Sequence, residues 1–185
     1  MKNMTVPNLI TLLRICLVPF LIYLVYKVNT PFFLLVLGVS LLSDVLDGYV
    51  ARLMNQTSDL GAKLDSVADT LTYCVMIFAL YQLWKDHFIE QAMFIYLAIS
   101  CYFVTTLISA FKFGELPSYH TLGAKVAALL LAPSYYLMVL FDAEFFFRSV
   151  IIFYILVAFE ELIITFMLKR PEKNIGSVFS LFRRI

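Results

Sequence analysis

Two polar segments interrupt an otherwise apolar sequence, and each carries a pair of aspartates. The first pair is Asp44 and Asp47, and the second pair is Asp65 and Asp69. Residues three or four positions apart lie on one face of an α-helix, so each pair can project from one helix face. The helices that carry them are close in sequence and should be antiparallel neighbours, joined by a loop of about six to eight residues. Four carboxylates can therefore converge between these helices.

Carboxylates that converge at membrane depth need positive charge among them. Each costs roughly 2.5–3.5 kcal/mol at the centre of a bilayer, and their mutual repulsion adds to this. We find no cation in the two segments that is sufficient to neutralise four acids, and no cysteine or histidine to build a zinc site. Carboxylate oxygens are hard ligands that prefer Mg²⁺, Mn²⁺ or Ca²⁺. Four of them can hold two divalent ions, an arrangement that suits phosphoryl displacement.

Small residues accompany the aspartates. Gly48, Ala51 and Gly61 leave room for close helix approach or for a flat, phosphate-bearing group. Arg52 follows one turn after Gly48, where a guanidinium can reach a pyrophosphate. Gly48 alone is equally typical of plain helix packing, but the whole set favours a binding site for a phosphorylated ligand.

The composition places this site in a membrane. The chain has 185 residues, of which 62% are hydrophobic, against roughly 45–50% in soluble domains. A soluble protein of this size could not cover so much apolar surface, so we expect the bilayer to be its solvent. The net charge is only +1, and we expect no nucleic-acid partner.

Apolar stretches of about 20 residues predict membrane-spanning helices. We find six, and they predict an all-α integral membrane fold that occupies residues 1–185 as a single domain. We interpret the first stretch as a retained helix and not as a signal peptide, because it is long and no small-residue cleavage site follows it. The predicted helices cover residues 6–27, 31–54, 61–84, 90–113, 121–141 and 145–168.

The distribution of Lys and Arg predicts the orientation. With the N-terminus inside, 11 basic residues fall on the inner side and three on the outer side. Cytoplasmic loops carry the excess of positive charge, so both termini and the aspartates should face the cytoplasm from the cell membrane. We expect the basic tail, residues 169–185, to lie on the inner leaflet as a short interfacial helix. The inner set is Lys2, Arg14, Arg52, Lys63, Lys112, Lys125, Lys169, Arg170, Lys173, Arg183 and Arg184, and the outer set is Lys27, Lys85 and Arg148.

The polar segments resemble the signature of a known family. The pattern Asp44-x2-Asp47-Gly48-x2-Ala51-Arg52-x8-Gly61-x3-Asp65-x3-Asp69 fixes eight residues over 26 positions and matches the CDP-alcohol phosphotransferase family. The resemblance implies a six-helix membrane domain, commonly a homodimer. It also implies that Asp44, Asp47, Asp65 and Asp69 surround two divalent ions, Mg²⁺ or Mn²⁺, and that Asp69 is also the general base. Asp44, Asp47, Asp65 and the four other motif residues would then form the CDP pocket.

The N-terminal stretch from Val6 to Arg14 resembles the phosphatidylglycerophosphate synthases of this family. The resemblance implies that Asn8 and Thr11 contact the nucleotide. The alternative is an ordinary helix start, with Arg14 reaching along the helix to the membrane surface.

The family resemblance implies transfer of a phosphatidyl group from a CDP-diacylglycerol-like donor to a small polar alcohol, with release of CMP. Glycerol 3-phosphate is the favoured acceptor, and serine, inositol and inositol phosphate remain alternatives. The third predicted helix departs from the phosphatidylglycerophosphate synthases, which usually have Pro and Lys where this chain has Ser66 and Thr70. Lys112 and Lys125 are the tentative acceptor-binding residues, since an anionic acceptor needs more than one positive contact. The alternative is that both lysines only set the topology.

Two functions from other classes compete with this interpretation. Intramembrane acids also mark ion pathways, so the chain could be an ion transporter. However, its acids cluster at one end of two helices and no polar trail continues toward the outer side. A catalytically silent scaffold is the other alternative, and the intact motif argues against it.

Overall fold

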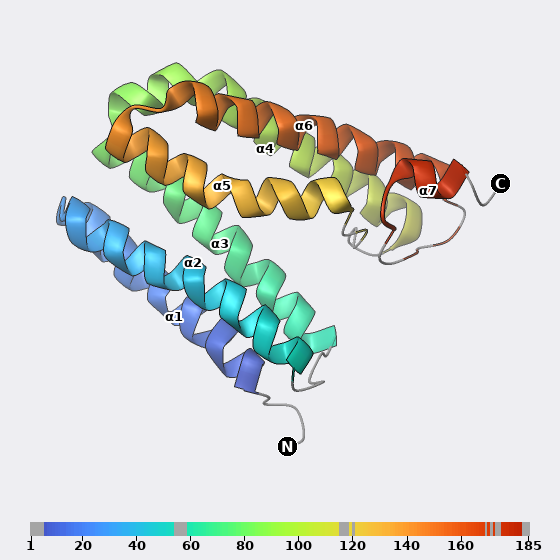
Figure 1. Cartoon of the computed structure of the whole chain (residues 1–185), viewed down its shortest axis with the longest axis horizontal. Helices are drawn as coiled ribbons and strands as arrows, with labels where there is room; N and C mark the ends of the chain where they lie inside the picture. Colours follow the sequence, from blue (N-terminus) through green and yellow to red (C-terminus); the bar gives the residue numbers. More distant parts are fainter. Residues whose placement is uncertain are drawn as a thin grey trace. The chain divides into compact units, whose positions relative to one another are not determined.

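The structure is a computed structural model, and in the part that it describes the regular secondary structure is entirely α-helical. It describes residues 6–53, 59–114, 119, 121–168, 170, 172 and 175–182, and only the backbone of residues 6, 47–53, 59, 60, 62 and 182. The six predicted helices are confirmed, with their ends shifted by a few residues, and Figure 1 shows them with one further short helix. They are α1 (Val6–Tyr26), α2 (Thr30–Leu53), α3 (Asp59–Leu83), α4 (Lys85–Phe113), α5 (Leu122–Phe141), α6 (Glu144–Met167) and α7 (Val178–Phe182).

Five of the long helices are long and apolar enough to cross a membrane. These five are α1, α3, α4, α5 and α6. In α2 the described side chains end at residue 46, and the stretch that they cover, Thr30–Leu46, is apolar. The outward faces of the long helices are also apolar, with Phe111 and Phe145 more than four-fifths exposed. So much exposed apolar surface is unfavourable in water but favourable in contact with lipid. The chain is thus a helical, multi-pass membrane protein.

The connection between α3 and α4 differs from the sequence-based expectation. We expected a loop before a helix at residue 90, but α4 begins at Lys85 and only Trp84 separates it from α3. The amide of Trp84 donates to the Leu80 carbonyl and the amide of Phe88 donates to the Trp84 carbonyl, both at 3.0 Å. Helical hydrogen bonding therefore continues across Trp84, which polarity alone did not reveal.

The chain divides into two compact units, and the first is Met1–Phe88. In this unit α1 packs against both α2 and α3. The turn from α1 to α2 is tight, with Val28 at a φ of 53°. Aromatic contacts join the helices at this end, since the rings of Tyr26 and Phe78 lie 5.6 Å apart. Because α1 contacts both other helices, its side chains can meet those of α2 and α3 together.

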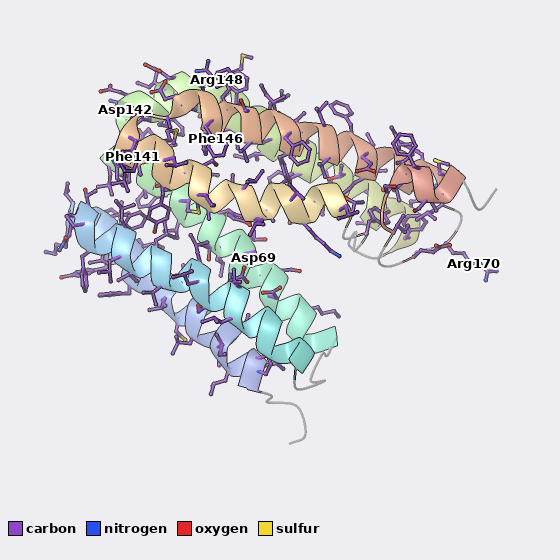
Figure 2. All side chains as sticks on the ribbon, in the orientation of Figure 1. Asp69, Phe141, Asp142, Phe146, Arg148 and Arg170 are labelled. Carbon is purple, nitrogen blue, oxygen red and sulfur yellow. The ribbon has the colours of Figure 1, made fainter. Side chains whose placement is uncertain are left out.

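The second unit, Ile89–Ile185, is built on a hairpin of α5 and α6. Thr121 caps the start of α5 by accepting a hydrogen bond from the Ala124 amide at 3.1 Å. Asp142 ends α5 in the left-handed conformation, with a φ of 54°. Figure 2 shows Asp142 and Arg148 at one end of this unit and Arg170 at the other.

The C-terminal segment packs against the protein. The amide of Ile175 donates to the Tyr119 carbonyl at 2.8 Å, and Ile175 and Leu181 are buried beside Tyr119, Ile164 and Leu168. The expected short helix is confirmed as α7, where Phe179 is 78% exposed. Only part of its apolar surface is therefore available to a membrane.

Candidate active site

Arg14 on α1 binds Asp44, Asp65 and Asp69, the motif aspartates whose side chains the structure describes. Its Nη1 atom donates to Oδ1 of Asp44 at 2.5 Å and to Oδ1 of Asp65 at 3.2 Å. Its Nη2 atom donates to Oδ1 of Asp69 at 2.8 Å. The Arg14 side chain is 1% exposed, whereas those of the aspartates are 35–46% exposed. One buried guanidinium thus joins α1, α2 and α3.

The local sequence explains this convergence. Asp65 and Asp69 are one turn apart on α3, so their carboxylates share a helix face, as predicted. Asp44 is in the second half of α2. Because α1 packs against both helices, Arg14 reaches both sides of the cluster. The predicted meeting of α2 and α3 acids therefore occurs around a residue of α1.

The three carboxylates fit a divalent metal. Asp44, Asp65 and Asp69 each offer one oxygen, and these oxygens lie within 4.8 Å of one another. Three carboxylates and one guanidinium leave a net charge of −2, which a divalent ion would balance. The donors are all hard oxygens of the kind that Mg²⁺ and Mn²⁺ prefer. Ser40, one turn before Asp44 on α2, also has a buried hydroxyl oxygen with no hydrogen-bond partner among the described residues.

The remaining motif residues are only partly described. Asp47, Gly48, Ala51 and Arg52 are in the last turns of α2, and their side chains lie outside the described residues. Gly61 is in the first turn of α3 and half-buried. Their predicted roles in metal and CDP binding stay predictions.

Asn8 and Thr11 lie on α1 before Arg14. Asn8 is 2% exposed and Thr11 is 4% exposed. The Thr11 hydroxyl donates to the Pro7 carbonyl at 3.1 Å, a bond within its own helix. These two side chains are therefore enclosed near the same helix face as Arg14, and nucleotide contact stays a prediction.

The two lysines proposed for the acceptor belong to the second unit and differ in their contacts. The Lys112 ammonium donates to the carbonyls of Thr165 at 2.9 Å and of Phe166 at 3.0 Å. It thereby caps the carboxyl end of α6, a favourable position for a cation. Lys125 is exposed in the first turn of α5. Lys112 thus has a structural role as a cap of α6, and its role in acceptor binding stays a prediction.

Sequence reasoning missed the partners of Arg14 and one acidic residue of α6. One alternative for Arg14 was a side chain that extends to the membrane surface. In the structure Arg14 is buried and contacts the motif aspartates. Glu160 was overlooked, although an acid inside an apolar helix was a visible signal. Its Oε1 atom accepts a hydrogen bond from the Val178 amide at 3.0 Å and so fixes the start of α7.

Comparisons with known proteins agree with the motif. A family model described as CDP-alcohol phosphatidyltransferase matches residues 4–167. A Pseudomonas fluorescens protein named CDP-diacylglycerol–glycerol-3-phosphate 3-phosphatidyltransferase is 42% identical over 82 residues, which are 43% of this chain and 42% of that protein. A protein of the same name from Aquifex aeolicus is 41% identical over 66 residues, 36% of this chain and 37% of that protein.

Other relatives are named cardiolipin synthase. A human protein named cardiolipin synthase (CMP-forming) is 38% identical over 77 residues, which are 41% of this chain and 26% of that protein. The chain thus spans from 26% to 42% of the length of these three relatives. No solved structure matches the chain.

Proposed function

Because this chain belongs to the CDP-alcohol phosphatidyltransferase family, we propose that it transfers a phosphatidyl group from CDP-diacylglycerol to a polar alcohol and releases CMP. The observation that carries the proposal is the convergence of Asp44, Asp65 and Asp69 from two helices, at the positions of the family motif. A membrane protein is suited to this donor, because the acyl chains can stay in the bilayer while the pyrophosphate enters the acidic site.

In the proposed reaction Asp69 is the general base. Its carboxylate takes the proton of the acceptor hydroxyl as the hydroxyl oxygen attacks the phosphorus that bears the lipid. The bond between this phosphorus and the CMP oxygen breaks, and CMP leaves with the bonding electrons. Ser43 is engaged within its own helix, where its hydroxyl donates to the Ser40 carbonyl at 2.7 Å. We therefore favour direct transfer over a covalent enzyme intermediate.

Asp44, Asp47, Asp65 and Asp69 would hold two divalent ions, Mg²⁺ or Mn²⁺. Bound ions would neutralise the charge that grows on the leaving CMP. The close carboxylate oxygens and their net negative charge support this assignment. The family resemblance implies Mg²⁺ or Mn²⁺, and a donor set without sulfur or imidazole suits such hard cations.

The proposed CDP pocket combines the motif with the start of α1. Asn8 and Thr11 would contact the nucleotide, with the motif aspartates Asp44, Asp47 and Asp65 completing the pocket around the pyrophosphate. The small residues would let the pyrophosphate approach the helix backbone, and the guanidinium of Arg52 would pair with the pyrophosphate. The small residues are Gly48, Ala51 and Gly61.

Glycerol 3-phosphate is the proposed acceptor. Two of the relatives carry it in their names, and Lys112 and Lys125 supply cations for its phosphate. Lys112 uses two of its three ammonium protons on α6 carbonyls, which leaves one for a ligand.

The second candidate acceptor is phosphatidylglycerol. Cardiolipin contains two phosphatidyl groups joined by glycerol, so a synthesis that forms CMP adds a phosphatidyl group to phosphatidylglycerol. A relative with that product in its name supports this candidate. The two acceptors share a glycerol hydroxyl and a phosphate, and they differ in the acyl chains.

The finer architecture is also part of the proposal. We propose that α2 is the sixth membrane span, with the acidic residues at its inner end. Both termini and the site would then face the cytoplasm of the cell membrane, as the excess of inner Lys and Arg predicts. Residues 1–185 would act as a single domain that forms a homodimer, as the family resemblance implies.

CMP release by the purified protein tests the reaction. The protein would receive CDP-diacylglycerol and Mg²⁺ or Mn²⁺ with one acceptor at a time, and the lipid product would be identified by mass spectrometry. The panel contains glycerol 3-phosphate, phosphatidylglycerol, serine, inositol and inositol phosphate. We expect glycerol 3-phosphate to give the highest rate. The proposed function would be contradicted if the protein released no CMP with any of these alcohols. Ion flux through the protein in proteoliposomes would then favour the transporter alternative.

A further inference from the structure

We propose that Arg14 is the resident counter-ion of the aspartate cluster and that a divalent cation displaces it from the carboxylates. The proposal deepens the proposed function, since it rests on Asp44, Asp65 and Asp69 being metal ligands. It assigns Arg14 a positioning role, because this residue acts on the acids and not on the substrate.

The first argument is the number and origin of the contacts. Arg14 is 1% exposed and donates to Oδ1 of Asp44, Asp65 and Asp69, which come from two other helices. A guanidinium presents its donors in a rigid planar fork, so it can hold several carboxylate oxygens together. Without a cation these carboxylates would repel one another. Arg14 thus keeps the cluster converged before metal binds.

The second argument is that the metal and the guanidinium would share the same three carboxylates. Nη2 of Arg14 lies 2.8 Å from Oδ1 of Asp69. An Mg²⁺ ion bound to that oxygen at about 2.0–2.1 Å would lie at most about 5 Å from this nitrogen. The ion and the guanidinium carry three positive charges between them, and at this separation they repel one another. Metal binding should therefore weaken or break the Arg14 contacts.

This competition predicts the sign of an affinity change. Arg14→Gln removes the cation that holds the oxygens and leaves a site of net charge −3 from Asp44, Asp65 and Asp69. Mn²⁺ should then bind more tightly, because nothing must be displaced. If Arg14 only held the fold together, its loss would loosen the site and weaken Mn²⁺ binding.

The experiment measures Mn²⁺ binding to the purified full chain by electron paramagnetic resonance, with thermal unfolding followed in parallel. We expect Arg14→Gln to lower the Mn²⁺ dissociation constant about tenfold, within the usual range for coupling between two binding events. The variant should unfold at a lower temperature than wild type in chelator, and Mn²⁺ should raise its Tm by more than it raises that of wild type.

A conservative variant covers the case in which Arg14→Gln does not fold. Arg14→Lys keeps the charge but replaces the planar fork with a compact ammonium, and we expect an Mn²⁺ dissociation constant about fivefold below that of wild type. Arg148→Gln is the matched control. Arg148 is also partly buried, but it donates to Gln91 in the second unit, so its loss should leave Mn²⁺ affinity unchanged.

Unchanged or weaker Mn²⁺ binding in every Arg14 variant that folds would overturn the proposal. The readout also separates this inference from the proposed reaction. Wild type that binds Mn²⁺ and shows the Arg14 effect, yet releases no CMP with any acceptor, would reject the reaction alone. Active wild type whose Mn²⁺ affinity does not respond to Arg14 substitution would reject only the role of Arg14.

Discussion

Arg14 and Asp69 are 55 positions apart in the sequence, and Nη2 of the one lies 2.8 Å from Oδ1 of the other. Because Asp69 is the proposed general base, this contact brings a residue of α1 to the group that would take the proton of the acceptor. Without metal, the guanidinium of Arg14 occupies one carboxylate oxygen of Asp69, and the proposed displacement of Arg14 by a divalent ion would release that oxygen.

Asp69→Asn should abolish most turnover. The amide keeps the size of the side chain but cannot accept the proton, so we expect kcat to fall roughly 10²–10⁴-fold with donor binding largely retained. Rates of CMP release and CDP-diacylglycerol binding would be measured on the same preparation. Asp86→Asn is the control, because Asp86 is an exposed acid of the same unit. Near wild-type turnover in Asp69→Asn would place the base elsewhere.

Removal of divalent metal should stop the reaction. Arg14 neutralises only one of the three carboxylates that it contacts, so the site keeps a charge that favours a divalent ion. We expect no CMP release in excess chelator, and recovery on addition of Mg²⁺ or Mn²⁺. Asp44→Asn should require a higher metal concentration for half-maximal activity. Activity that persists undiminished in chelator would exclude the metal-dependent mechanism.

The two acceptor lysines should behave differently on substitution. Lys125→Ala should raise KM for glycerol 3-phosphate about tenfold, the loss of one charge-assisted contact, and leave KM for CDP-diacylglycerol unchanged. Lys112→Ala should raise the same KM and also lower Tm, because it uncaps α6. Lys85→Ala, an exposed lysine at the start of α4, is the control. Unaltered acceptor KM in both variants would shift the preference toward serine.

Cysteine labelling in intact cells should reveal the orientation. Single cysteines at positions 56 and 173 should react only after the membrane is permeabilised, and a cysteine at position 86 should react in intact cells. The native cysteines Cys16, Cys74 and Cys101 would first be replaced. The excess of inner Lys and Arg motivates this expectation. The opposite labelling pattern would place the acids away from the cytoplasm.

Gly123→Ala should destabilise the second unit. A Cβ atom at Gly123 would lie 2.8 Å from Cγ2 of Val157 on α6, and the rotation of a β-branched side chain is restricted. Overpacking costs about 1–3 kcal/mol, which exceeds the gain in helix propensity of up to about 1 kcal/mol. The double variant with Val157→Ala should recover part of the lost Tm. Additive effects of the two substitutions would show that the close approach is unimportant.

The sequence by itself was sufficient for the helices and for the prediction that acids of two helices converge where they could hold a metal. Long apolar stretches mark helices in a membrane protein because backbone polar groups must pair within the chain there. The helix period then places Asp65 and Asp69 on one face without knowledge of any neighbour. The α3–α4 boundary was missed because polarity at residues 85–89 looks the same in a loop and in a helix that reaches the membrane surface.

The tertiary structure decided which residues accompany the acids. An arginine in an apolar helix can extend to the surface or pair with acids inside the protein, and its own sequence neighbours are the same in both cases. Only the packing of α1 against both α2 and α3 brings Arg14 to Asp44, Asp65 and Asp69. The same holds for Lys112, whose partners on α6 are more than 50 positions away. Such long-range pairs depend on how helices pack, and helix periodicity carries no information about that.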